Sequence, residues 1–418
     1  MSSDTVSGGL FERLESSGLS LRYVLGLLGL VFMAVLPLLS EFELGIGIPG
    51  VFVFAVDNLL LLKLTGALYF GMFAMSWDVV SGYTGQISFG HGVFFAVGGY
   101  TSALLNIEFG IAPALAVPVG VVLAAVTGLV IGVPALRLRG PYLSLVTLVA
   151  PLILLNVFIW QSGTFGGERG LLGEDYFLGL GSDAALEVYY IALVLFTLIF
   201  ALLFAVTRSD AGRVFTAIRE DEDAVAAAGL NPAKFKTFAF VLSAAVGGLA
   251  GAMFVHSPVG GARPSELMSV IVNVEVIIAA ILGGMGTIVG AAIGGVFLIL
   301  LQDGLSNLGD ALTIPIPGTE TGVVLTPPIP FSQMDFLLFA VITLVLLLVL
   351  PGGIVRAGIR GGRRVLRRVR SDREDPVATD GGRVEDSNDG ENADAGRAPE
   401  RAVYRNYRDA LEGDDDEH

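Results

Sequence analysis

Long apolar runs dominate the hydropathy pattern of the chain, and polar residues fall mainly between these runs. A helix needs about twenty apolar residues to cross the hydrocarbon core of a bilayer. An unbroken run such as 191–206 does not alternate in the way that the strands of a transmembrane barrel do. The pattern predicts an all-α polytopic membrane protein with about ten transmembrane helices. The expected spans are residues 21–39, 58–77, 88–105, 112–134, 142–160, 188–206, 235–256, 267–282, 287–302 and 335–350.

The basic residues of the short loops predict how these spans are oriented. They precede the first span and follow the fourth, sixth and tenth, as in Arg13, Arg139, Arg213 and Arg356. With ten crossings, all four regions fall on one side, which the positive-inside rule identifies as the cytoplasm. Both termini are therefore expected in the cytoplasm.

Composition supports this class and removes several others. Hydrophobic residues make up 53% of the chain and charged residues 16%, whereas soluble domains are about a quarter charged. The absence of Cys excludes disulfides and thiolate metal sites, and His91, His256 and His418 lack ligand spacing, so no metal is expected. The net charge of −15 and the scarcity of lysine suit a high-salt cytoplasm, and we expect a halophilic archaeon as the source.

Two glycine-rich stretches interrupt the apolar pattern in opposite halves of the chain, at 81–99 and 283–295. Paired interrupted helices point to a midplane pathway between inverted repeats. Tight packing of helices through small residues explains the same pattern equally well. The polar and glycine residues that could line a pathway here are Gln86, Ser88, His91, Gly283 and Gly284.

Glu275 lies inside the apolar run 271–282. A carboxylate within a membrane helix is costly and is a pathway candidate by default. If the helix starts later, Glu275 instead lies at its wet external end. Asp57 and Lys63 are expected to form a structural pair near the interface.

Four stretches together resemble the branched-chain amino acid ABC permease family of the LivM type. They are SGYTGQISFGHG at 81–92, LRLRGPYLSLVT at 136–147, AIREDEDAVAAAGL at 217–230 and LGGMGTIVG at 282–290. The stretches occur in the family's order, and the resemblance covers residues 58 to about 301.

This resemblance implies a permease subunit in the plasma membrane that works with a second homologous permease, two cytoplasmic ATPases and an external binding protein. It implies leucine, isoleucine, valine or a related solute as the substrate. One departure is that residues 166–171 read GGERGL where the family often has Gly-Gly-Ser-Asp-Gly-Leu. Permeases for urea, short amides or simple sugars therefore stay open. An ion-coupled secondary transporter would need several intramembrane carboxylates.

Hydropathy and composition divide the chain into parts. These are a cytoplasmic arm at 1–20, a permease domain at 21–350 with a coupling loop at 207–236, a basic juxtamembrane segment at 351–370 and a disordered acidic tail at 371–418. Residues 51–56 are left open as a re-entrant piece.

The segment after the sixth span predicts a short amphipathic cytoplasmic helix. Val214, Ile218 and Val225 can line its apolar face, and Gly229 followed by Pro232 ends it. Its sequence resembles the Glu-Ala-Ala-x-x-x-Gly loop whose helix docks in an ATPase groove, and a solvated surface helix is the alternative. Wet charges are expected at Arg219, Glu220 and Glu222. The predicted coupling residues are Arg213, Ile218, Arg219, Glu220, Asp221, Glu222, Ala227 and Gly229.

The glycine-rich runs lack the Lys-Ser/Thr of a phosphate-binding loop. The chain is therefore expected to be no enzyme, to need no cofactor, and to bind no nucleic acid. ATP would be bound by partner subunits.

Overall fold

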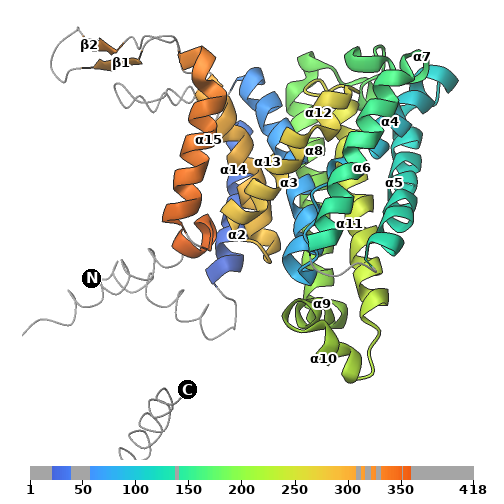
Figure 1. The fold of residues 1–418 in the computed structure, drawn as a ribbon. Helices are drawn as coiled ribbons and strands as arrows, with labels where there is room; N and C mark the ends of the chain where they lie inside the picture. The colour runs from blue at the N-terminus through green and yellow to red at the C-terminus, as the bar shows by residue number, and fades with distance from the viewer. Residues whose placement is uncertain are drawn as a thin grey trace, which may run out of the picture. The chain divides into compact units, whose positions relative to one another are not determined.

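A computed structural model describes residues 21–38, 57–136, 141–306, 312–315, 322–325, 331–350 and 352–358. Several expectations lie outside these residues: the arm at 1–20, the piece at 51–56, most of the basic segment at 351–370 and the acidic tail at 371–418. The described part is almost entirely helical, as the hydropathy pattern predicts (Figure 1).

Within these described ranges, ten longer helices correspond one to one with the ten expected spans. They are α2 (Leu21–Val35), α3 (Asn58–Thr84), α4 (Gly92–Phe109), α5 (Pro113–Ala135), α6 (Pro141–Trp160), α8 (Ala185–Arg208), α11 (Pro232–Val255), α13 (Val270–Gly283), α14 (Ile288–Ser306) and α15 (Phe331–Val349). By length and apolar composition, 7 segments of the described chain could cross a membrane. The apolar stretches in α2 and α15 are shorter, at Gly29–Leu38 and Leu337–Val349.

Shorter elements lie between the long helices. One end of the bundle carries α7 (Ser162–Phe165), η2 (Gly167–Arg169), η3 (Phe177–Gly179), η4 (Ser182–Ala184) and α12 (Pro264–Met268). The opposite end carries α9 (Asp210–Glu220) and α10 (Glu222–Ala227) (Figure 1). A two-stranded antiparallel ladder also forms between β1 (Leu312–Pro315) and β2 (Gly322–Leu325). It was not predicted, although β-branched residues bounded by Pro and Gly are a strand signal.

Two of the expected span boundaries are wrong. The third span begins at Gly92 rather than at Ser88, because the backbone from Gly85 onward is irregular and Gly85 itself is left-handed, with φ 72°. The eighth is divided at Ser269, whose side chain accepts a hydrogen bond from the backbone N–H of Val272 and so starts α13 as a separate helix.

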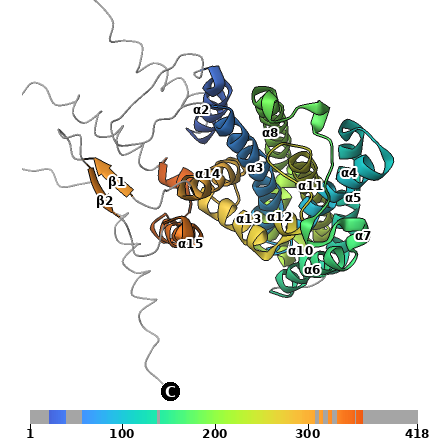
Figure 2. The same cartoon turned by 90° about the horizontal axis from the view of Figure 1, so that it is seen from above.

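The two halves of the chain pack in corresponding ways. In the first half α4 packs on α5, and in the second α13 packs on α14; between halves, α5 packs on α11 and α14 packs on α3. Helices α3 and α11 pack on each other and occupy the middle of the bundle (Figure 2). Helix α3 ends, and α11 begins, at the end that carries α9 and α10 (Figure 1). This antiparallel correspondence is the arrangement that inverted-repeat halves produce.

Backbone contacts at glycines bring these helices together. A Cβ atom at Gly98 of α4 would overlap the backbone of Gly248 in α11. A Cβ atom at Gly295 of α14 would lie 2.6 Å from the Cα atom of Gly71 in α3. Small residues allow this close approach, which maximises van der Waals contact between helices in a solvent that supplies little hydrophobic drive.

We expect Gly98→Ala to lower the thermal stability of the detergent-purified protein by about 1–3 kcal/mol, because the added methyl group forces α4 and α11 apart. Gly304→Ala is the matched control, since beyond its own helix backbone no atom of the described chain lies within 4 Å of its Cβ position. The control should be neutral or slightly stabilising, because Ala is the better helix former. Melting curves that lower the midpoint of both variants equally would contradict the packing argument.

Candidate functional site

The element after α8, which the sequence predicts on the cytoplasmic side, is built as two helices rather than the single helix that the sequence suggested. Ser209 precedes α9, whose buried residues are Gly212, Phe215 and Ile218. The chain then turns extended at Asp221, with φ −157°. The Asp221 carboxylate accepts a hydrogen bond of 2.9 Å from the backbone N–H of Ala224 and so starts α10. An Asp favours this capping geometry over the helix interior, which explains the break.

The apolar residues of this element face their own chain. Ile218 is 3% exposed and Val225 is 6% exposed, so of the two surfaces that could face a partner, these apolar side chains or the small Ala226–Ala228 face, only the alanine face is open. The exposed face of α10 instead carries the small side chains of Ala226, Ala227 and Ala228. Gly229, with φ 83°, follows this face and ends the element, as predicted.

Most of the predicted coupling residues lie on the surface. Arg213 pairs with Asp210 at 2.7 Å, but both side chains are largely exposed, so the pair contributes little to stability. Glu220 and Asp221 are also exposed.

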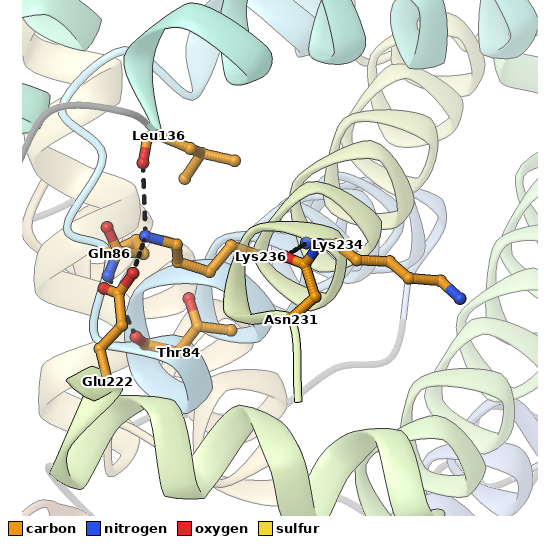
Figure 3. Close-up of polar contacts among 7 residues, drawn as sticks. All are labelled: Thr84, Gln86, Leu136, Glu222, Asn231, Lys234 and Lys236. Atoms are coloured by element: carbon orange, nitrogen blue, oxygen red, sulfur yellow. Dashed lines mark hydrogen bonds and ion pairs between the residues drawn. The ribbon is translucent and has the colours of Figure 1, made fainter. Parts of the chain in front are cut away.

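Lys236 joins α10 to the membrane helices (Figure 3). Its side chain is 4% exposed, and its Nζ atom lies 2.8 Å from Glu222 Oε1 and 3.3 Å from the carbonyl oxygen of Leu136. Glu222 is therefore half-buried in an ion pair and is not the wet charge that was expected. Leu136 caps the end of α5, where carbonyls lack helical partners, so a cation there is favourable. In Figure 3, Asn231 accepts from the backbone N–H of Lys234 and starts α11.

Arg219 makes a second contact of the same kind. Although most of its side chain is exposed, its Nη1 atom donates a 2.7 Å hydrogen bond to the carbonyl oxygen of Gly82. Gly82 lies in the last turn of α3, so Arg219 satisfies one of the carbonyls left open there. The α9 helix thus supplies the Arg219 cation to the end of α3. Lys236, through its ion pair with Glu222, holds α10 against the end of α5.

The irregular segment between α3 and α4 is held by side chains from other helices. The backbone N–H of Phe89 donates to Thr147 Oγ1 at 3.1 Å, and that of Gly92 donates to Asn273 Oδ1 at 2.7 Å. The indole N–H of Trp77 donates to the carbonyl oxygen of Ser88 at 2.7 Å. Non-helical backbone at membrane depth requires such internal partners. The segment is therefore a built part of the bundle.

His91 is locked inside this bundle. It is fully buried, and its Nε2 atom lies 3.0 Å from Ser76 Oγ and 2.9 Å from Ser243 Oγ. Both serine hydroxyls donate to backbone carbonyls, of Phe73 and Ser76, so Nε2 is the donor to the serine oxygens. These contacts favour a structural role for His91.

The other pathway candidates are also engaged within the chain. Ser88 is buried, and half-buried Gln86 donates from Nε2 to the carbonyl oxygen of Thr84 at 3.4 Å (Figure 3). Gly283 packs directly on Gly290, and Gly284 has φ 129° at the end of α13.

Glu275 lies in the second turn of α13 and is 8% exposed, so it is not at a wet helix end. Its Oε1 atom accepts from Gln302 Nε2 of α14 at 3.3 Å. The expected pair of Asp57 with Lys63 is wrong: Lys63 pairs with Asp303 at 2.9 Å, and Asp57 caps α3.

Two buried charged residues were missed by sequence reasoning. Asp78 is fully buried within the apolar helix α3, and its Oδ1 atom accepts from the backbone N–H of Gly286 at 2.7 Å. The rule that singled out Glu275 would also have found Asp78. Nothing in the sequence shows that Lys236 folds back onto Leu136, because that contact joins residues far apart in the chain.

Comparison with known proteins then decides the family. Residues 59–350 match the family model described as the permease component of the branched-chain amino acid transport system. The chain belongs to this family. The matched residues, 59–350, include both Gly82 and the α9–α10 element.

Individual relatives in the branched-chain amino acid transport system permease family carry names that agree. The high-affinity branched-chain amino acid transport system permease protein LivM of Escherichia coli is 30% identical over 270 residues, which is 58% of this chain and 62% of that protein. LivM of Salmonella typhimurium is 29% identical, over 61% of this chain and 65% of that protein. The chain thus spans slightly less than two thirds of these two relatives. A probable LivM of Methanocaldococcus jannaschii is 23% identical over 69% of this chain and 91% of that protein.

Among solved structures, an inward-facing conformation of a putative metal-chelate type ABC transporter matches this chain with a TM-score of 0.41 and 16% identity. The match covers 78% of this chain and 99% of that chain.

We expect Glu222→Gln to destabilise α10 by ~1–2 kcal/mol, because buried Lys236 loses its counter-charge and keeps only neutral acceptors, the Leu136 carbonyl and the introduced amide oxygen. The effect is moderated because Glu222 is 32% exposed. The readout is the rate of limited proteolysis between α9 and α11. Glu220→Gln, the same change at an exposed position, should leave the rate as in the wild type. Equal rates for all three proteins would show that the ion pair contributes nothing.

Proposed function

We propose that this chain is the transmembrane permease subunit of an ABC importer for branched-chain amino acids. The family match over 59–350 carries this proposal, since it spans nearly the whole membrane region. The α9–α10 element supports the proposal, because Arg219 and Lys236 hold it against the membrane helices and a subunit that receives work from an ATPase needs a rigid contact. We propose that ATP is bound by partner subunits and that this chain holds no cofactor.

The partners proposed are a second homologous permease, two cytoplasmic ATPases and an external binding protein. The ATPase contact is placed on the exposed alanine face of α10, between Asp221 and Gly229. The exposed apolar side chains of α5 and α6 suit lipid or the second permease; they include Leu115, Val122, Val130, Leu145 and Ile153. A halophilic archaeal plasma membrane, with both termini in the cytoplasm, remains the proposed setting.

Urea, short amides or simple sugars are the alternative substrates. The segment 166–171, where the sequence departs from the family pattern, is tied to the loop before α12 by a 2.9 Å hydrogen bond from the Leu171 N–H to the Ala262 carbonyl oxygen. An ion-coupled mechanism is disfavoured, since Glu275 and Asp78 are buried against Gln302 and Gly286 rather than open to a pathway.

The function is tested by uptake into proteoliposomes that contain this chain, the neighbouring-gene permease and ATPases, and the binding protein. Labelled leucine should accumulate only when ATP is supplied on the cytoplasmic side. Uptake of urea but not leucine would replace the substrate class, and leucine uptake driven by an ion gradient without ATP would overturn the importer assignment.

We expect Ala227→Glu to abolish ATPase docking. A bulky charge on this small-residue face would be both a steric overlap and an uncompensated buried charge in the interface, costing several kcal/mol (about 3–5). The measurements are co-purification of the ATPases and substrate-stimulated ATP turnover. Ala112→Glu, at an exposed position before α5 on the opposite side, is the matched control and should behave as the wild type. Wild-type values for Ala227→Glu would show that α10 is not the docking site.

Orientation is tested with single cysteines, which are unique because the chain has none. Ser182 and Ser209 are both exposed and lie at opposite ends of α8. In intact cells, an impermeant thiol reagent should modify Ser182→Cys and spare Ser209→Cys. The reverse pattern would invert the proposed topology.

A further inference from the structure

Three segments that are distant in sequence meet where Arg219 reaches the membrane domain. Arg219 Nη1 donates to the carbonyl oxygen of Gly82 near the end of α3, at 2.7 Å. Four residues earlier in the same helix, Asp78 Oδ1 accepts from the backbone N–H of Gly286, also at 2.7 Å. Gly286 belongs to the turn between α13 and α14. Helix α9, the end of α3 and this turn therefore share one small polar junction.

The residues at this junction are closely packed. A Cβ atom at Gly286 would lie 2.7 Å from Arg219 Nη1 and 3.2 Å from the Gly82 carbonyl oxygen, and a Cβ atom at Gly82 would lie 2.6 Å from the Gly286 nitrogen. Atoms of the neighbouring segments therefore already occupy the space that each Cβ atom would take. Because close-packed groups transmit displacement instead of absorbing it, a shift of Arg219 must move the segments it touches.

Asp78 and Arg219 meet at the same residue of the turn. Asp78 is fully buried in an apolar helix, and its Oδ2 atom has no hydrogen-bond partner among the described residues. Its Oδ1 atom accepts from the Gly286 N–H, and Arg219 Nη1 lies against the same glycine. Arg219 and Asp78 therefore both position the turn, and Arg219 also bonds α3 directly.

The turn leads into the membrane. Helix α14 starts just after it and packs along α3 through the contact of Gly295 with Gly71. Further along, α14 carries Gln302, the partner of the membrane-buried Glu275. A movement of the turn is thereby connected to the deeper part of the bundle.

We propose that Arg219 is a positioning residue that transmits movement of α9 to the end of α3 and to the α13–α14 turn, with Asp78 as the link between them. This proposal rests on the importer function proposed above. Lys236 and Glu222 hold the same cytoplasmic element but contact α5 and not this turn, so they provide a contact of similar chemistry without the transmission role.

The experiment compares Arg219→Met with Lys236→Met in the full reconstituted transporter. Each change replaces a long cation with a neutral, unbranched side chain, which is close in length to Lys and shorter than Arg. Leucine uptake, ATP turnover and ATPase co-purification are measured together. Loss of one charge-assisted hydrogen bond at the junction should raise the ATP hydrolysed per leucine by about tenfold in Arg219→Met. In Lys236→Met, uptake and turnover should fall together, leaving the ratio near that of the wild type.

Two further variants test the link itself. Asp78→Asn keeps an acceptor for Gly286 but loses the charge, and it should raise the same ratio. Since Arg219 and Asp78 act through one another, the double variant should show no more than the larger single effect. Arg219→Lys, which keeps the positive charge and N–H donors on a shorter side chain, should raise the ratio less than Arg219→Met.

The outcomes separate this proposal from the importer function. A wild-type ratio in Arg219→Met, or an equal rise in Lys236→Met, overturns the transmission role while leaving the importer intact. No ATP-driven uptake by the wild-type assembly overturns the importer function instead. Should Arg219→Met fail to assemble, Arg219→Lys and Asp78→Asn decide by the same ratio, and a wild-type ratio in both rejects the proposal.

Discussion

Close approach of helix backbones is the constraint on which the rest of this structure depends. In a lipid solvent, apolar side chains gain little by leaving the surrounding hydrocarbon, so association relies on contact area and shape. The glycines that pair α4 with α11 and α3 with α14 leave no room for even a methyl group, at Gly98, Gly251 and Gly295. Helices fixed in this way have few ways to move independently, and displacement at one end is carried along their length.

Such rigid helices still end in unpaired carbonyls, and the α9–α10 element uses them. Arg219 bonds the Gly82 carbonyl of α3, and Lys236 bonds the Leu136 carbonyl of α5. The helix macrodipole favours cations at these ends. Because Lys236 is buried and also paired with Glu222, its contact is costly to break, which fixes the position of α10. The element is thus held by the same groups that complete the membrane helices.

The hydropathy of the sequence was enough to place ten helices, because spans of about twenty apolar residues follow directly from bilayer thickness. Hydropathy did not predict helix ends that depend on local polar groups. Asp221 divides the helix after α8 into α9 and α10, and the backbone before Gly92 is irregular, so α4 starts later than expected. Hydropathy failed again for contacts between distant segments, such as Asp78 with Gly286, since periodicity describes which face is apolar and not which helix covers it. The signal for Asp78 as a special residue was nevertheless present, as a carboxylate in an apolar run.

The two contacts of the α9–α10 element fall on the two helix pairs that correspond between the halves. The packing of α5 on α11 corresponds to that of α14 on α3, and Lys236 lies at the first of these pairs while Arg219 bonds the end of α3 in the second. Because the halves are antiparallel, Lys236 lies at the start of α11 and Gly82 at the end of α3, so the two contacts use different ends of equivalent helices. The break at Asp221 separates α9, which carries Arg219, from α10, which carries Glu222, the partner of Lys236. A single continuous helix could hold both contacts only if they kept a fixed spacing, whereas two helices joined at Asp221 do not impose that spacing.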